Sequence, residues 1–232
     1  SNSFRKIFSK VKFININNIE MILSKIYKKK VIIDKNTCSI FYENFIFKNN
    51  EILNQQDPIY ALKAIKTKKE ILQFVKFPFS LYKNCKYWVP PLTKDELETL
   101  DKTNNPVFKN ADAIYYLAFK NNKIVGRIAA IINHIEVNEQ NKKKIRFGWL
   151  DMVDDIEVTK ALLQKVYAVG KQHSLEYAEG PVGFSNMEKA GILTFGFEEL
   201  NTMITWYQYP YYAEHLKKLG FQKQATWVEF RL

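Results

Sequence analysis

The sequence predicts a mixed α/β fold built around a largely antiparallel sheet. Residues 124–132 are rich in β-branched side chains and include a single charged one, Arg127, as expected of a strand that is buried on both faces. A polar connection leads to a second apolar strand over 145–153. Asp154 and Asp155 then supply N-cap chemistry for a helix with a periodic apolar face. This hairpin with its following helix is the expected centre of the fold.

The elements before this central hairpin are predicted from helix-capping residues and from the pattern of apolar residues. Thr67 and Glu70 form a capping box, which opens a helix that we expect Pro78 to end. Gly126, early in the first central strand, is expected at a bulge or a close backbone approach. The other expected elements are a strand over 59–65, a short helix over 95–100 and a strand over 113–120.

The elements after the centre complete the order β-α-α-β-β-β-α-β-α-α-β. Ser185 and Glu188 form a second capping box, which predicts a short helix. Pro210 and Gly220 are typical of the start and the end of a helix. The remaining expected elements are a strand over 177–184, a helix over 211–219 and a final strand over 226–232.

Two parts of the chain are predicted. Residues 1–57 are expected to form a small N-terminal α+β appendage, with a short helix near 18–27 and a β-hairpin over 31–47. Residues 58–232 are expected to form the main domain, with polar residues 49–57 as the linker.

Composition excludes several classes of protein. At 47% hydrophobic and 15% aromatic residues, the chain is globular rather than disordered. It has no apolar run of roughly 18–20 residues and no signal-peptide pattern, so we expect a cytoplasmic protein. Cys38 and Cys85 have neither metal-ligand spacing nor a disulfide framework around them, and no metal is expected.

The charge balance, 35 Lys and Arg against 24 Asp and Glu, gives a net charge of +11 and favours anionic partners. The lysines are scattered, and the abundance of Ile, Lys and Asn together indicates a compositional bias instead. The chain has no nucleic-acid-binding motif, so no specific nucleic acid is expected. The basic helix expected in the appendage leaves two alternatives open: peripheral contact with a membrane, or packing on the main domain.

Several short motifs between 58 and 232 resemble a group of bacterial acyltransferases of unassigned substrate in the GNAT (acyl-CoA N-acyltransferase) superfamily. Each motif alone is weak, and together they are fairly specific. They are FP-x-x-LY-K at 77–83, WVPPL at 88–92, NP-x-F at 105–108, VGRIAA-x-x-N at 125–133, GP-x-x-FS at 180–185 and YY-x-x-x-L-x-x-x-GF at 211–221.

The resemblance implies a GNAT-like mixed, mostly antiparallel central sheet flanked by helices. It also implies that the strands over 145–153 and 177–184 diverge and hold acetyl-CoA or a longer acyl-CoA between them. The cofactor-binding residues implied at this gap are Met152, Val153, Asp154, Ser185 and Asn186. Ser185 has an alternative role as a helix cap.

One departure from the family pattern concerns the diphosphate of CoA. The glycine-containing pyrophosphate loop of the family, R/Q-x-x-G-x-G/A, is absent, and the equivalent turn over 153–158 carries three carboxylates. Like charges at that turn disfavour a diphosphate. This favours the alternative function of a non-catalytic GNAT-like domain that binds a ligand or a protein.

N-acyl transfer needs a neutral amine and a proton for the leaving thiolate. Asp151 is the candidate base, with a solvated strand-end carboxylate as the alternative. Tyr211 and Tyr212 are candidate acids, although the family's tyrosine position corresponds to Leu216, and aromatic packing is their alternative. His134 is a second candidate base, or a hairpin-tip histidine without a role.

We therefore predict an N-acyltransferase that moves an acyl group from acyl-CoA to an amine. The aromatic stretch over 206–212 and Trp88 suit a small-molecule or lipid-like amine as the acceptor. The oligomeric state is left open by the sequence.

Overall fold

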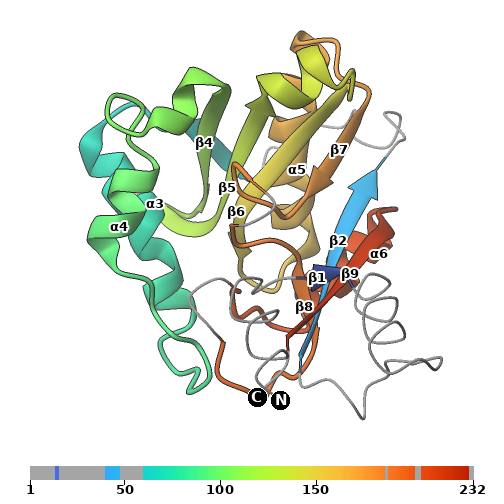
Figure 1. Ribbon diagram of the computed structural model, residues 1–232. Coiled ribbons are helices and arrows are strands. Elements are labelled where there is room, and N and C mark those ends of the chain that lie inside the picture. Colours follow the sequence, from blue (N-terminus) through green and yellow to red (C-terminus); the bar gives the residue numbers. More distant parts are fainter. Residues whose placement is uncertain (1–13, 16–39, 48–59, 186–187, 202–204, 230–232) are drawn as a thin grey trace, which may run out of the picture.

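The computed structural model describes residues 14–15, 40–47, 60–185, 188–201 and 205–229 (Figure 1). The described strands are β1 Ile14–Asn15, β2 Ile40–Phe47, β3 Ala61–Ala64, β4 Ala111–Lys120, β5 Lys123–Asn133, β6 Lys144–Met152, β7 Tyr177–Gly180, β8 Ile192–Phe195 and β9 Gln222–Glu229. They form one sheet in the order β1-β9-β2-β7-β6-β5-β4-β3, with β8 paired to β2. Among these strands β6 and β7 pair in parallel, and the other pairs are antiparallel. The mixed, mostly antiparallel sheet predicted from the sequence is confirmed.

Helices cover the sheet. The described helices are α3 Lys68–Leu81, α4 Thr93–Thr99, α5 Ile156–Gln172 and α6 Tyr211–Lys218, with a 3-10 turn η1 at Pro106–Lys109 and a π turn η2 at Ile135–Glu139. Figure 1 shows α3 and α4 together on one side of the molecule, beside β4. None of the helices among the described residues is long and apolar enough to cross a bilayer.

Strand β5 lies between two hydrophobic cores, because its side chains alternate between the faces of the sheet. Ile128 and Ala130 pack in the core that contains α5 and α6. Ala129 and Ile131 pack in the core that contains α3 and β4. Their complete burial explains why this stretch of the sequence lacks the polar alternation of a half-exposed strand.

Helix α5 packs closely on β5 at a glycine. A Cβ atom on Gly126 would lie 2.8 Å from Leu162 Cδ1 and 3.0 Å from Val158 Cγ1. The register between β4 and β5 also shifts next to this residue. The expected close approach is confirmed, and so is the N-cap of α5, since the Asp155 side chain accepts from the Glu157 amide.

The Thr67–Glu70 capping box is confirmed at the start of α3. The predicted end at Pro78 is wrong, because α3 continues through this residue to Leu81. Proline removes the N–H that would bond the carbonyl four residues earlier, which is that of Phe74. Arg127 Nη1 donates to this carbonyl at 2.8 Å, so the interruption is compensated by a buried side chain.

The helix predicted after Ser185 is wrong for the part of it that the structure describes. The Glu188 amide donates to the Ser185 carbonyl, residues 188–191 are not helical, and the chain then enters β8. The buried Ile192 pairs with β2, so sheet pairing outweighs the local capping signal. Strand β7 is also shorter than predicted, ending at Gly180 before a cis peptide bond to Pro181.

The predicted domain boundary at residue 57 stays a prediction. Strand β2 lies on the appendage side of it and pairs with β7, β8 and β9 in the same sheet. The helix expected near 18–27 lies outside the described residues.

We expect Gly180→Ala to destabilise the fold by about 1–3 kcal/mol, because the new Cβ would lie 2.3 Å from the Phe147 carbonyl oxygen. Gly170→Ala is the matched control. It meets the Ile145 side chain at 3.1 Å but gains helix propensity in α5, so its net effect should stay within about 1 kcal/mol. Urea unfolding of both variants measures the difference, and equal effects would contradict the close approach of β6 and β7.

Candidate functional site

Strands β6 and β7 pair at their beginnings and then separate. Their register runs from Lys144 opposite Tyr177 to Arg146 opposite Glu179. One further bond, from the Val182 amide to the Phe147 carbonyl at 2.8 Å, closes the paired part. Among the described residues, no strand pairs with the rest of β6 on this side of the sheet. The chain after β7 stays beside β6 as far as Gly148, so the separation implied by the family resemblance is limited to the part of β6 that follows.

A β-bulge lies in β6 where the strands separate. The register with β5 passes from Asp151 opposite Arg127 to Gly148 opposite Ala129, so two residues of β6 face one of β5. Trp149 within this bulge has a φ of 47°, which is unusual for a bulky residue. Backbone strain of this kind is concentrated at functional sites.

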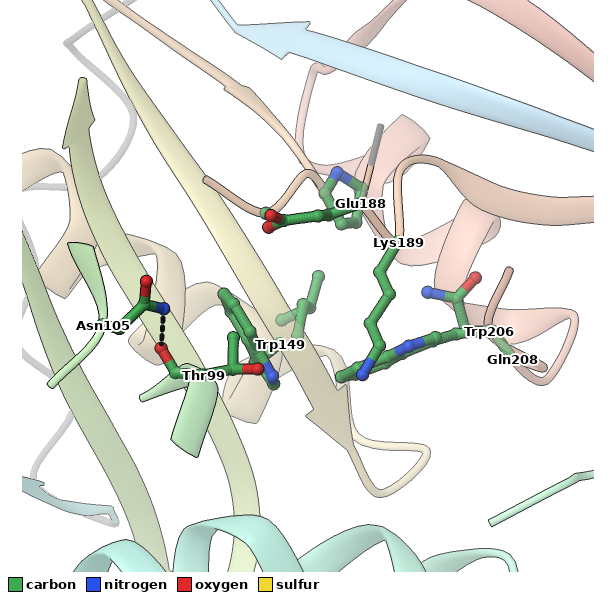
Figure 2. A pocket seen from close by; sticks show the side chains of 10 residues that line it. Thr99, Asn105, Trp149, Glu188, Lys189, Trp206 and Gln208 are labelled. Atoms are coloured by element: carbon green, nitrogen blue, oxygen red, sulfur yellow. Dashed lines mark hydrogen bonds between the residues drawn. The ribbon is translucent and has the colours of Figure 1, made fainter. Parts of the chain in front are cut away.

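A cavity of about 260 Å³ opens beside the bulge. Trp149 and Leu150 of β6 form one wall, and Pro181 and Gly183, which follow β7, form another. Figure 2 shows Lys189 extending across the cavity toward Trp149 and Trp206. The remaining lining residues are Thr99, Asn105, Glu188 and Gln208. The cavity thus occupies the gap between the two diverging strands.

Further along β6, the main chain of Met152 is bonded to tyrosines. The Tyr211 hydroxyl donates to the Met152 carbonyl at 2.7 Å, and the Met152 amide donates to the Tyr212 hydroxyl at 3.4 Å. The next amide, that of Val153, instead bonds Val125 of β5 at 2.9 Å. The end of the β6 edge is thus occupied by side chains of α6.

Asp151 lies at the centre of a buried polar network. Its Oδ2 accepts from Arg127 Nε at 2.7 Å, and the Tyr82 and Tyr212 hydroxyls each donate to its Oδ1 at 3.1 Å. The side chains of Arg127 and Asp151 are 2% and 1% exposed. Burial raises the pKa of Asp151, with Arg127 opposing this effect, and burial also raises the pKa of Tyr82 and Tyr212. The sequence did not predict this pairing.

The N-terminus of α5 carries its own carboxylates. Besides capping the helix, Asp155 accepts from the Tyr60 hydroxyl at 2.6 Å and pairs with Lys120 at 3.2 Å. Asp154 is largely exposed and lies 3.2 Å from Nε2 of His215. The positive end of the helix is therefore already compensated by acidic side chains.

The other predicted site residues are not gathered at the cavity. His134 bonds Asp112 at 2.9 Å and lies seven residues along the extended chain from Arg127, about 23 Å at the usual rise of a strand. Ser185 follows β7 and lies two residues after the cavity-lining Gly183. Asn186 lies outside the described residues. The catalytic and cofactor-binding roles of all these residues stay predictions.

The sequence analysis missed two residues that line the cavity, Trp149 and Lys189, and one beside it, Glu96. Glu96 is a buried carboxylate on α4 that bonds Trp149 Nε1 at 2.9 Å and pairs with Lys189. A signal for Glu96 was available, since Glu96 and Leu100 lie four residues apart and so share one helix face. Trp149 and Lys189 carry no local pattern that marks them.

Comparison with families found no matching family model. Protein YghO of Escherichia coli is 30% identical over 172 residues, which cover 72% of this chain and 44% of that protein. The bacterial ceramide synthase of Caulobacter vibrioides is 25% identical over 160 residues, which cover 68% of this chain and 42% of that protein. The chain therefore spans less than half the length of these two relatives.

Solved GCN5-related N-acetyltransferases are among the structures similar to this chain. The one from Sphaerobacter thermophilus has a TM-score of 0.49 at 9% identity, over 98% of this chain and 55% of that one. A tandem GNAT protein from the clavulanic acid biosynthesis pathway has a TM-score of 0.49 at 9% identity, over 82% of this chain and 52% of that one. These proteins belong to the superfamily that the sequence motifs resemble.

We expect Asp151→Asn to reduce the free energy of unfolding by about 3–5 kcal/mol, because it leaves the buried Arg127 charge without its counter-ion. Tyr82→Phe, which removes one neutral donor to the same carboxylate, should cost about 1 kcal/mol. Urea unfolding compares the two. Similar losses of unfolding free energy in the two variants would mean that the network does not depend on the Arg127–Asp151 charge pair.

Stability should also depend on the protonation of His215. Burial lowers the pKa of this histidine, with Asp154 opposing, and its Nδ1 lies 2.9 Å from the Thr159 hydroxyl. The unfolded chain then binds a proton at a higher pH than the folded chain does. Stability is therefore lost as the pH falls below about 6.5, at no more than about 1.4 kcal/mol per pH unit.

Unfolding measured at pH 7.5 and pH 5.5 tests this dependence. His215→Gln should remove part of the difference between the two conditions. The exposed His173 at the C-cap of α5 is the matched control, and His173→Gln should leave the difference unchanged. An unaltered pH dependence in His215→Gln would refute the assignment.

Proposed function

We propose that this chain is the acyl-CoA-binding part of a GNAT-type N-acyltransferase that transfers an acyl group to a lipid-like amine. The observation that carries this proposal is the separation of β6 from β7 around a cavity at a β-bulge. A strand edge that lacks a partner strand can bond an extended ligand through its main chain. The pantetheine arm of an acyl-CoA is such a ligand, because it carries amide groups.

In this proposal the thioester lies at the bulge, with its acyl end toward the apolar wall formed by Trp149 and Leu150. The neutral amine nitrogen attacks the thioester carbon and forms the C–N bond, the C–S bond breaks, the nitrogen loses one proton to water, and the departing thiolate takes up a proton. Burial raises the pKa of Tyr211, which keeps its hydroxyl protonated at neutral pH. We assign Tyr211 as the proton donor, since its hydroxyl already lies on the β6 edge at the Met152 carbonyl.

Asp151 is assigned a positioning role. Its carboxylate is fully buried and fixes Arg127 and the Tyr212 hydroxyl, which in turn accepts from the Met152 amide. Such a network orders the end of β6 next to the proposed thioester site. A carboxylate engaged in this way has no free approach to an amine.

The acceptor class is inferred from the cavity and from a relative. Two tryptophans, Trp149 and Trp206, line the cavity and suit an apolar chain next to an amine. One relative is named for a ceramide, and a ceramide is an N-acylated lipid amine. We therefore propose a long-chain primary amine as the acceptor, with acetyl-CoA or a longer acyl-CoA as the donor.

A second function, that of a non-catalytic GNAT-like binding domain, is favoured by two observations. The main chain of Met152 is bonded by Tyr211 and Tyr212, at a position where a pantetheine arm would bond. Asp154 and Asp155 surround the helix end where a diphosphate would lie. For acyl-CoA to bind, its arm must displace a tyrosine hydroxyl and its diphosphate must lie away from these carboxylates.

Calorimetric titration with acetyl-CoA and with a dodecanoyl-CoA separates the two functions. The transferase proposal expects at least one of them to bind in the micromolar range, about −8 kcal/mol. Free CoA is the control for binding through the nucleotide alone. If neither thioester binds to folded protein, the binding-domain function replaces the transferase.

We expect Tyr211→Phe to keep the affinity for the acyl-CoA, or to raise it, while slowing acyl transfer. Loss of the hydroxyl frees the Met152 carbonyl for the ligand but removes the proposed proton donor, which is worth about 10²-fold or more in rate. Release of CoA thiol in the presence of dodecylamine measures the rate. Tyr116→Phe on β4, two strands away from β6, is the control and should behave as the wild type. A transfer rate in Tyr211→Phe equal to that of the wild type would exclude Tyr211 as the proton donor.

A further inference from the structure

Next to the cavity lies a buried carboxylate that pairs with a lysine of the same chain. Glu96 is 4% exposed and lies on the face of α4 that packs inward. One of its oxygens accepts from the indole N–H of Trp149 at 2.9 Å, and the other pairs with the Lys189 ammonium. Buried carboxylates are retained where a cation compensates them. Glu96 therefore makes this position selective for a positive charge.

The Lys189 ammonium also lies on an aromatic face. Its Nζ is 4.4 Å from the centre of the Trp206 ring, and its side chain is 22% exposed (Figure 2). The guanidinium of Arg127 lies 5.2 Å from the same ring and helps to fix it. A carboxylate combined with an indole face is how proteins recognise organic ammonium groups.

We propose that Glu96 and Trp206 form the binding site for the ammonium group of the acceptor, and that Lys189 fills this site as an internal substitute until an acceptor displaces it. The proposal rests on the proposed function, and it adds the position and the chemistry of acceptor recognition. The ligand class is a primary alkylamine, because Lys189 and Trp206 line a cavity of about 260 Å³ and the Lys189 ammonium reaches the Glu96 carboxylate beside it.

The location of this site suits the reaction. Trp149, which donates to Glu96, belongs to the bulge of β6 where the thioester is proposed to lie. Leu150, its neighbour in the bulge, lines the same cavity. An amine bound in place of the Lys189 ammonium would therefore lie next to the edge of β6.

The pKa of Lys189 also shows how burial at this position affects the protonation of an amine. Burial lowers the pKa of Lys189 to about 7, with the carboxylate of Asp95 opposing this effect. The same burial would lower the pKa of an acceptor amine in this place. Acyl transfer requires the neutral amine, so a site that first attracts the cation and then favours its neutral form serves both steps.

Binding of octylamine and of octanol, measured by calorimetry without any acyl-CoA, tests the proposal. Lys189→Met removes the internal cation and keeps a side chain of similar length. We expect this variant to bind octylamine at least about tenfold more tightly than the wild type, with little change for octanol. Adding Glu96→Gln should abolish the gain, and glutamine retains an acceptor for the Trp149 indole. Lys160→Met on α5, where Lys160 pairs with Glu157, is the matched control and should not alter binding.

Two outcomes would overturn the proposal. One is octylamine binding by Lys189→Met that is no tighter than in the wild type, and the other is an equal gain for octanol, which would indicate a larger apolar cavity only. If Glu96→Gln fails to fold, Trp206→Leu in the Lys189→Met background provides the second test and should also weaken octylamine binding. Because these titrations contain no thioester, their failure is distinguishable from a failure to bind acyl-CoA.

Discussion

The buried ion pair between Arg127 and Asp151 is the interaction on which the architecture of the site depends. It joins β5 to β6 next to the bulge, reaches α3 through the Phe74 carbonyl and reaches α6 through the Tyr212 hydroxyl. Two charges removed from water are costly unless every remaining donor and acceptor is satisfied. Here the two tyrosine hydroxyls and one free helix carbonyl satisfy them. The position of four elements around the diverging strands is therefore set by one polar network within two apolar cores.

The central hairpin, the helix after it and the final helix and strand could be predicted from the sequence, because their signals are local. Apolar runs, an N-cap at Asp155 and a proline–glycine pair around 211–219 act over a few residues. The helix expected after Ser185 failed because its capping signal competes with pairing between β8 and β2, which are far apart in the chain. Arg127 was noticed only as an exception in an apolar strand, although it proved to organise the site.

The candidate site was less predictable, because its residues come from separate parts of the fold. The resemblance pointed to a gap between β6 and β7, but the side chains found around this gap were not evident from the sequence. Glu96 comes from a short helix, Lys189 from a turn and Trp206 from the segment before α6. Tyrosine hydroxyls thus bond the main chain at the end of β6, and the Lys189 ammonium pairs with the Glu96 carboxylate. A ligand for this site has to displace the tyrosine hydroxyls at Met152 and the ammonium at Glu96. This selects for ligands that can make the hydrogen bonds of the first and carry the charge of the second.

The proline within α3 has a consequence for the specificity of the whole arrangement. An alanine in place of Pro78 would provide an amide hydrogen that the Phe74 carbonyl could accept, and the helix would then bond to itself. The guanidinium that now reaches this oxygen at 2.8 Å would have to share it. Proline is usually regarded as a helix breaker, but here it leaves the Phe74 carbonyl without a helical donor and so available to the buried Arg127 guanidinium. Because Pro78 has no amide hydrogen, the Phe74 carbonyl is left to orient the Arg127 guanidinium.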